Sequence, residues 1–450
     1  MTALALCYQD LGKKVSGSDI AEVFVTDAIL AERRIAWTVG IGPQNLKRLP
    51  DLLVMTAAHG GLSNPEAVYA KEHNVPVITF ADGQADLSKR KKTITVCGVG
   101  GKTTTCSMIA TVLDYAGLHP SFTVGVGNIF PLGVPGRFDK KGEHFICEGD
   151  EFVISPGINN NPKFSLLDPK VVVVTNIEHD HPDIYPTIED TKRVFLNFFK
   201  KIPKKGVLVA CVDNKNVSQI VKKLEIPVVT YGFNKNADWQ IKNLHFGDGK
   251  THFSLISRTK KIKDLTLNIP GRFNVQNATA AFAVGNFLGL DAETLKAGLE
   301  RYQGCMRRFQ IMGQWRGSTF FDDYAHHPDE IKATLKAARE WFPERKITAV
   351  FQPHTYSRTK VLFKEFARAF SDTNVVALMD IYASAREKDD GTISSKMLWE
   401  ETKKHHKNVF YTGGQRETLA WIKKNVRRGG VILTMGAGDI FHLYDKLFQK

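Results

Sequence analysis

A glycine-rich loop is the strongest chemical signal in the sequence. Residues 97–105 read CGVGGKTTT, after a strand-like run at 93–97 and before apolar residues at helical spacing. Glycines let backbone N–H groups approach phosphate oxygens closely, and the start of the following helix adds its positive dipole end. A lysine at this point can neutralise β- and γ-phosphates, and a threonine hydroxyl can hold Mg²⁺. The predicted nucleotide-binding residues of the loop are Gly98, Gly100, Gly101, Lys102, Thr103 and Thr104.

Oxygen-bearing side chains follow the next two strand-like runs, 143–147 and 170–175. Ligands of open α/β sheets bind at the carboxyl ends of the strands, and Mg²⁺ prefers hard oxygen ligands. The sequence therefore predicts a metal and phosphate site where these strands end. The alternative interpretations are a glycine turn with a surface lysine, solvated loop carboxylates, and a histidine packed against Pro182. The side chains concerned are Glu148, Asp150 and Glu151 after the first run, and Asn176, Glu178, Asp180 and His181 after the second.

Strand and helix patterns alternate along most of the chain. The four valines at 171–174 indicate a strand buried on both faces, as in a parallel sheet. Residues 240–267 alternate apolar and polar side chains, which predicts a small antiparallel insertion. Residues 319–434 repeat strand–helix units, and the polar stretch 81–92 is interpreted as a linker. The predicted fold class is α/β with an open, doubly wound sheet.

Composition narrows the functional class. The 450 residues suggest two to four domains, and 43% hydrophobic and 24% charged residues are typical of a globular protein. We find neither a signal peptide nor a long apolar run, and the six cysteines form no C-x-x-C pair, so we expect a cytoplasmic protein without a membrane partner. The net charge of +14 comes from dispersed basic residues, which favours an anionic small substrate over nucleic acid.

An ordered set of motifs resembles the Mur ligase family of peptidoglycan synthesis. The motifs are GVGGKTTT, TNIEHDH, GRFNVQNATAA, RRFQ, FDDYAHHPDE, FQPHTYSRT and TMGAGD. The resemblance implies three domains: a Rossmann-like UDP-sugar domain at 1–90, a central P-loop ATPase-like parallel sheet at 91–304, and a Rossmann-like amino-acid domain at 305–450. It also implies ATP-dependent amide formation through an acyl phosphate, with ATP and Mg²⁺ as cofactors. The implied substrates are UDP-N-acetylmuramate and L-alanine, and the implied assembly is a monomer or homodimer.

The resemblance also assigns roles position by position. The implied nucleotide-binding residues outside the loop are Asn274, Asn277, Arg308 and Asp323. The implied metal ligands are Thr103, Glu148 and His181. The implied catalytic residues are Lys102, Glu148, His181, His326 and Arg358. The alternatives are helix capping for Asn274, loop packing for His326, and a solvated helix start for Arg358.

Four departures from the family pattern leave alternatives open. Residues 1–5 resemble the start of the helix that follows the family's first glycine loop, so the first domain is interpreted as lacking its first strand and that loop. Val99–Gly100 replaces a usual Thr–His pair, Phe273 replaces a common histidine, and Thr355 replaces an arginine usual in ligases for alanine. The run CEGDEFVIS is closer to relatives that attach a murein tripeptide. Attachment of that tripeptide, or nucleotide binding without ligase activity, are therefore the alternative functions.

Overall fold

The computed structural model describes residues 1–22, 24–57, 59–155, 157–179, 184–247, 249–383, 389, 391–426 and 428–448. The chain divides into two compact units. The first unit comprises Met1–His245, His252–Leu267 and Phe273–Gln303, and the second comprises Phe246–Thr251, Asn268–Arg272 and Gly304–Lys450. In the described part of the chain, no helix is long and apolar enough to cross a bilayer.

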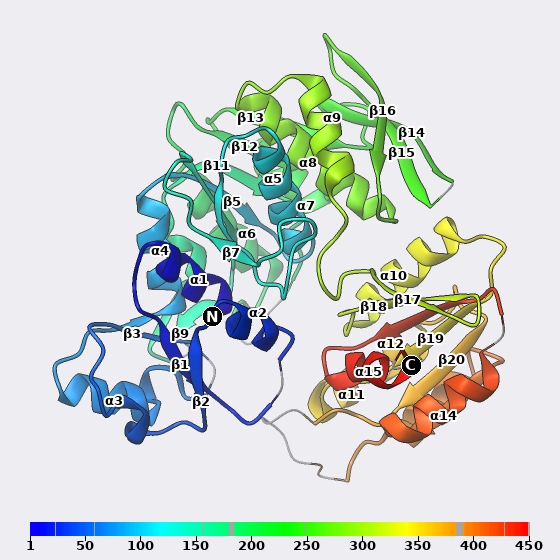
Figure 1. Ribbon diagram of the computed structural model, residues 1–450. Helices are drawn as coiled ribbons and strands as arrows, with labels where there is room; N and C mark the ends of the chain where they lie inside the picture. The colour runs from blue at the N-terminus through cyan, green and yellow to red at the C-terminus, as the bar shows by residue number, and fades with distance from the viewer. Residues whose placement is uncertain are drawn as a thin grey trace. The chain divides into compact units, whose positions relative to one another are not determined.

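A large sheet organises the first unit (Figure 1). Its strands are β5 (Lys92–Cys97), β6 (Ser121–Thr123), β7 (Gly136–Arg137), β8 (His144–Gly149), β11 (Pro169–Val174), β12 (Val207–Cys211), β13 (Val228–Gly232), β14 (Trp239–Gly247), β15 (Lys250–Ile256) and β16 (Lys261–Leu267). Their order is β16-β15-β14-β13-β12-β11-β5-β8-β6-β7. The strands β14, β15 and β16 lie side by side at one end, where the sequence predicts an antiparallel insertion (Figure 1).

The centre of this sheet is parallel and buried. Strand β5 lies between β8 and β11 and runs parallel to both, with Cys97 paired to Gly149 on one side and to Val174 on the other. All four valines at 171–174 are fully buried, as expected for a strand covered on both faces. The three strands therefore end at the same edge, and the residues that follow them meet there.

Helices and three small sheets complete the first unit. The helices are α1 (Thr2–Asp10), α2 (Asp27–Glu32), α3 (Pro65–Glu72), α4 (Phe80–Lys89), α5 (Lys102–Tyr115), α6 (Ile188–Phe199), α7 (Lys215–Val221), α8 (Arg272–Phe287) and α9 (Ala292–Arg301). Two of the small sheets are parallel pairs: β1 (Ser16–Asp19) with β2 (Ala36–Val39), and β3 (Leu53–Met55) with β4 (Val77–Thr79). The third pairs β9 (Val153–Ser155) antiparallel with β10 (Asn159–Pro162).

The predicted linker at 81–92 is wrong, because most of it is helix α4. Thr79 caps this helix: its hydroxyl oxygen accepts the N–H of Asp82 at 3.2 Å, and the Asp82 carboxylate accepts the N–H of Thr79 at 2.9 Å. Ala85 and Leu87 are buried in the core that the helix shares with the sheet. The segment resembles a linker because many of its residues are polar. It is an amphipathic helix, and the residues on its buried face are mostly small.

The second unit contains a six-stranded sheet. Its strands are β17 (Gln310–Trp315), β18 (Ser318–Asp323), β19 (Ile347–Phe351), β20 (Val375–Met379), β21 (Val409–Gly413) and β22 (Val431–Met435), in the order β17-β18-β22-β19-β20-β21. The helices are α10 (Pro328–Trp341), α11 (Tyr356–Val361), α12 (Phe363–Ala367), α13 (Ser395–Lys403), α14 (Gln415–Asn425) and α15 (Leu443–Leu447). All the strands are parallel except β17, which pairs antiparallel with β18 at one edge.

The predicted fold class is confirmed: the chain is α/β, with mainly parallel sheets and antiparallel parts. One strand of the second unit, β17, lies before the predicted strand–helix run at 319–434 and was not predicted. The division into three domains stays a prediction.

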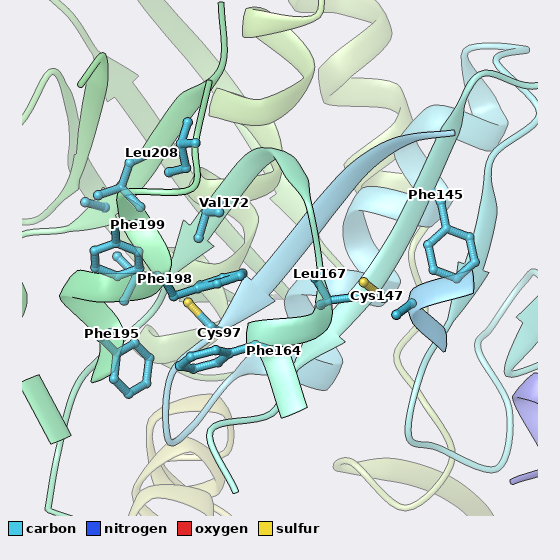
Figure 2. Packing of buried hydrophobic residues seen from close by; sticks show 14 of the residues in the cluster. Cys97, Phe145, Cys147, Phe164, Leu167, Val172, Phe195, Phe198, Phe199 and Leu208 are labelled. Atoms are coloured by element: carbon cyan, nitrogen blue, oxygen red, sulfur yellow. The ribbon is translucent and has the colours of Figure 1, made fainter. Parts of the chain in front are cut away.

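Phenylalanine rings dominate the core between the large sheet and α6. Phe164 stacks on Phe198 with ring centroids 4.4 Å apart and meets Phe195 edge-on at 5.4 Å. Figure 2 shows these rings with Phe199, gathered beside Cys97 and Val172 of the central strands. The packing holds α6 against the strands whose ends carry the candidate site.

We expect Phe195→Ala to lower the free energy of unfolding of the chain by about 3–5 kcal/mol, because Phe195 is fully buried and its removal leaves a cavity. The matched control is Phe287→Ala, at a ring that is 38% exposed, for which we expect a loss below about 1 kcal/mol. Urea denaturation followed by circular dichroism measures both. Equal losses in the two variants would contradict the assignment of this core.

Candidate functional site

The glycine-rich loop at residues 98–101, here called the phosphate loop because the sequence predicts that it binds phosphate, connects β5 to α5. Two of its residues have backbone conformations that glycine adopts most readily. Gly98 has φ +127° and Gly101, the residue before the helix, has φ +84°. A Cβ on Gly98 would lie 2.3 Å from the Thr175 hydroxyl oxygen and 2.7 Å from the carbonyl oxygen of Asn176. The loop therefore requires glycine at position 98 for two reasons, the dihedral angle and the close approach of the strand-end loop that follows β11.

The residues after β11 hold the phosphate loop in place. The N–H of Gly100 donates to the Asn176 side-chain oxygen at 2.9 Å, and the Asn176 amide donates to the Gly100 carbonyl at 3.3 Å. The Thr175 hydroxyl donates to the same carbonyl at 2.5 Å. Asn176 is one of the oxygen-bearing side chains that the sequence predicts at this strand end, whereas Thr175 was not predicted. The signal that could have identified Thr175 is its place directly after a strand adjacent to β5.

Lys102 is bound by a carboxylate and a carbonyl. Its ammonium lies 2.6 Å from the Gly98 carbonyl oxygen and 3.0 and 3.2 Å from the two Glu151 carboxylate oxygens. Burial favours the neutral amine, but the carboxylates of Glu151 and Asp150 outweigh it, so the pKa of Lys102 lies above its ordinary value. Lys102 is therefore a permanent cation at the start of α5. The sequence indicates Glu151 as an acidic side chain after a strand, but it does not predict this pairing.

Thr103 and Glu148 form a cluster of oxygen ligands beside the lysine. The Thr103 hydroxyl lies 3.1 and 3.2 Å from the two carboxylate oxygens of Glu148, which also accepts the N–H of Gly125 at 2.6 Å. A hydroxyl and a carboxylate are hard donors, so their chemistry fits Mg²⁺. Thr104 follows in the first turn of α5 and is half-buried. His181, the third predicted metal ligand, lies outside the described residues, and within those residues no three His, Cys, Asp or Glu side chains gather as a metal site.

Of the two predicted asparagines of α8, Asn277 lies against the glycine loop, and Asn274 contacts Asn277. A Cβ on Gly101 would lie 2.8 Å from the Asn277 side-chain oxygen, and the Asn277 amide donates to the Asn274 side-chain oxygen at 3.3 Å. Both asparagines are buried. Helix α8 begins at Arg272, so Asn274 lies inside its first turn and is not the N-cap. The structure thus brings the predicted nucleotide residues of the first unit together.

In the second unit, Asp323 is a buried carboxylate at the end of β18. It accepts the N–H groups of Phe309 at 2.7 Å and Ala325 at 2.8 Å. Burial raises the pKa of Asp323 to about 6, against the opposing effects of the Arg308 guanidinium and these two donors. The Arg308 guanidinium lies over the Tyr324 ring, 5.4 Å from its centroid.

His326 and Arg358 lie near the same edge of the second sheet. The Arg358 guanidinium donates to the His354 carbonyl at 3.1 Å, and the rings of His354 and His326 meet edge-on with centroids 6.3 Å apart. Burial lowers the pKa of His326, although the carboxylate of Glu330 opposes this, so the neutral imidazole is favoured. His354 was not predicted; it stands in the FQPHTYSRT motif but has no spacing signal of its own.

Arg307, adjacent to the predicted Arg308, is a buried structural cation. Its guanidinium lies 2.8 Å from the Asp322 carboxylate and donates to the carbonyls of Gly436 and Gly438 at 2.5 and 3.2 Å. These contacts fix the glycine loop after β22 beside the end of β18. Because the motif reads RRFQ, the sequence did not distinguish the buried arginine from the half-buried one.

Thr355, which stands where an arginine was expected, is buried at the start of α11. Its hydroxyl lies 3.2 Å from that of Ser357, and its carbonyl accepts the N–H of Thr359 at 3.0 Å. The threonine thus packs at the helix start, next to Arg358 in the chain.

Comparison with known families and proteins gives matches along the whole chain. The family models that match are "Mur ligase family, catalytic domain" at residues 1–92, "Mur ligase middle domain" at 96–285, and "Mur ligase, glutamate ligase domain" at 307–438. The UDP-N-acetylmuramate--L-alanine ligase of Acetivibrio thermocellus is 39% identical, over 100% of this chain and 93% of the relative. That of Desulfosudis oleivorans is 36% identical, over 98% and 94%.

Two solved structures also match this chain over nearly its whole length. The crystal structure of the UDP-N-acetylmuramate-alanine ligase from Thermotoga maritima matches with a TM-score of 0.82 and 27% identity, covering 99% of this chain and 95% of that one. A murein peptide ligase from Psychrobacter arcticus matches with a TM-score of 0.70 and 22% identity, over 99% and 95%. The second match shows a shared fold.

We expect Gly98→Ala to reduce stability by about 2–4 kcal/mol and to abolish measurable ADP binding, because the new methyl group collides with Thr175 and strains the backbone. Gly117→Ala is the matched control: its φ is +71°, but a Cβ there meets nothing within 4 Å. That variant should lose about 1 kcal/mol and bind ADP normally. Thermal unfolding and calorimetric titration with ADP measure the two effects. Normal ADP binding by Gly98→Ala would disprove the loop assignment.

The raised pKa of Asp323 predicts a pH-dependent stability. The folded chain binds the carboxyl proton of Asp323 more tightly than the unfolded chain, in which the pKa of this group is 3.8. The protonated carboxyl therefore contributes its full stabilisation of the fold below pH 3.8, and this contribution is lost as the pH rises through about 6. Relative to Asp323→Asn, whose amide does not titrate, the wild type should lose about 1.3 kcal/mol between pH 5 and 7. Urea denaturation of both proteins across this range measures it. A difference that does not vary with pH would contradict the shift.

Proposed function

Because the chain belongs to the Mur ligase family, we propose that it joins L-alanine to UDP-N-acetylmuramate in peptidoglycan synthesis, converting ATP to ADP and phosphate. The observation that carries the choice of substrates is the identity of 34–39% to ligases of that name over 98–100% of the chain. The three family models match successive parts of the chain, at residues 1–92, 96–285 and 307–438.

The geometry of the first unit supports phosphate binding. The N–H groups of the glycine loop and the start of α5 supply donors and a positive dipole end, and Lys102 supplies a fixed positive charge. Amide synthesis through an acyl phosphate needs such charges, because a substrate carboxylate and a triphosphate repel each other. The carboxylate oxygen attacks the γ-phosphorus, the bond to the β,γ-bridging oxygen breaks, and ADP leaves with that electron pair. The amine then attacks the acyl carbon, loses a proton, and displaces phosphate.

We propose Thr103 and Glu148 as ligands of Mg²⁺, with His181 as a third ligand from outside the described residues. Thr103 and Glu148 support this assignment because their oxygens already lie within 3.2 Å of one another beside the phosphate loop. When bound, Mg²⁺ would screen the negative charge of the phosphates. Asn274 and Asn277 are proposed nucleotide contacts, since Asn277 lies beside Gly101 of the same loop and its amide donates to the side chain of Asn274.

The second unit is proposed to bind the amino acid. Arg358 offers a planar guanidinium, which suits the carboxylate of an incoming amino acid. His326 is proposed to face the substrates in its neutral form, and Arg308 and Asp323 to face the nucleotide. We further propose a cytoplasmic monomer or homodimer with domains at 1–90, 91–304 and 305–450. We expect neither a nucleic-acid nor a membrane partner.

The test of this function is phosphate release from ATP in the presence of UDP-N-acetylmuramate, compared across L-alanine, L-serine, glycine and the murein tripeptide. We expect release that depends on L-alanine. Release with the tripeptide alone would move the function to attachment of that peptide. No release with any acceptor, while ADP still binds, would support a nucleotide-binding protein without ligase activity.

The matched variant for this assay is Lys102→Arg. It keeps a cation beside the buried Glu151, so the fold is preserved, but the guanidinium does not reproduce the compact ammonium. We expect alanine-dependent release to fall by about 100-fold or more. Wild-type rates in this variant would disprove the role of Lys102.

A further inference from the structure

Glu151 is a carboxylate buried beside the proposed phosphate site. Its side chain is 3% exposed, and both of its carboxylate oxygens lie within 3.2 Å of the Lys102 ammonium. Its backbone is held separately, because the Tyr185 hydroxyl donates to the Glu151 carbonyl at 2.6 Å. In the described part of the chain, Lys102 is the cation paired with this carboxylate. The position of Glu151 is therefore fixed by its backbone, and its charge is balanced by the lysine.

A neighbouring carboxylate has a different partner. Asp150 pairs with Lys163 at 2.7 Å, and its side chain is 39% exposed. Asp150 thus has its own cation and is accessible to water. Glu151 is shielded from water, and its cation is Lys102. Burying a carboxylate without a partner is strongly unfavourable, so the Glu151–Lys102 contact is the one that the fold must keep.

The Lys102 ammonium is surrounded by acceptors of the protein. A lysine ammonium has three N–H donors. The Gly98 carbonyl and the two Glu151 oxygens all lie within hydrogen-bond distance of them. A phosphate oxygen that approaches Lys102 must therefore share this ammonium with Glu151. The negative charge of Glu151 also repels the phosphate directly.

We propose that Glu151 is a positioning residue for the reaction: it fixes the Lys102 ammonium beside Gly98 and limits how tightly that lysine binds nucleotide. The inference rests on the nucleotide part of the proposed function. Tight binding of ATP in the ground state does not speed the chemical step, whereas a correctly placed charge does. A carboxylate that orients the lysine while weakening its attraction for phosphate serves both needs, and it favours release of ADP.

The test is Glu151→Gln in the full chain, because glutamine keeps the size of the side chain and removes the charge. We expect ADP to bind about 3- to 10-fold more tightly, the KM for ATP to fall, and kcat to fall by about tenfold. Calorimetric titration with ADP and steady-state phosphate release measure these quantities. A purely structural role would lower the amount of active protein and leave the ADP affinity of the folded fraction unchanged.

Asp114→Asn is the matched control, since it removes the same charge from a carboxylate of α5 that pairs with Arg137 at 2.6 Å and that belongs to no proposed site. We expect its ADP affinity to stay within about twofold of the wild type. Unchanged or weaker ADP binding by Glu151→Gln would overturn the proposal. An equal gain in both variants would also overturn it, because charge alone would then explain the effect.

Two further variants cover the case in which Glu151→Gln does not fold. Glu151→Asp keeps the charge but withdraws the carboxylate from Lys102, so kcat should fall while ADP affinity changes less than about twofold. The double variant Lys102→Gln with Glu151→Gln should unfold at a higher temperature than Lys102→Gln alone, because it leaves no unpaired buried charge. If Glu151→Asp retains the wild-type kcat, the proposal fails.

The outcome for Glu151 is separable from that for the proposed function. ADP titration needs neither UDP-N-acetylmuramate nor an amino acid. If the wild type releases no phosphate with any acceptor, the proposed ligase activity fails, and the ADP affinities of the variants still decide whether Glu151 restrains Lys102.

Discussion

The first unit depends on one close contact, between the glycine backbone that leaves β5 and the residues that leave β11. There is no room for a side chain at Gly98, because the Thr175 hydroxyl occupies that space. The same contact lets Thr175 and Asn176 bind both backbone groups of Gly100. The loop is thus held before any ligand arrives, and this preorganisation is what lets backbone donors act on phosphate at little further entropic cost.

The charges of the site follow from this geometry. Because β5 lies between β8 and β11, the lysine at the start of α5 is placed beside carboxylates from the region where β8 ends. The arrangement pairs each cation with a nearby carboxylate: Lys102 with Glu151 and Lys163 with Asp150. Glu148 does not belong to either pair, and it is the carboxylate that contacts the Thr103 hydroxyl. The carboxylates that balance the charges of the two lysines are therefore different from Glu148, the carboxylate proposed as a metal ligand.

In the second unit too, the residues that follow neighbouring parallel strands meet at one edge of the sheet. Strands β18, β22 and β19 are neighbours, so the loops that follow them lie at one edge. There the buried Arg307 ties the glycine loop after β22 to Asp322, while Asp323 binds the N–H groups of Phe309 and Ala325. Both aspartates thus hold backbone or side-chain groups of the fold, and of the two arginines Arg307 is buried in these contacts while Arg308 is the candidate for ligand binding.

The sequence by itself determined the fold class and the strand–glycine loop–helix arrangement that places Lys102 and Thr103 at the start of α5, because glycine, strand and helix signals are local and occur at fixed spacing. It did not determine helix α4, whose polar residues resemble a linker until Ala85 and Leu87 meet the core. Nor did it determine which carboxylate pairs with Lys102, or which of Arg307 and Arg308 is buried. Those outcomes depend on which strands become neighbours and how deeply each side chain is buried, and both are decided by long-range packing in the tertiary structure.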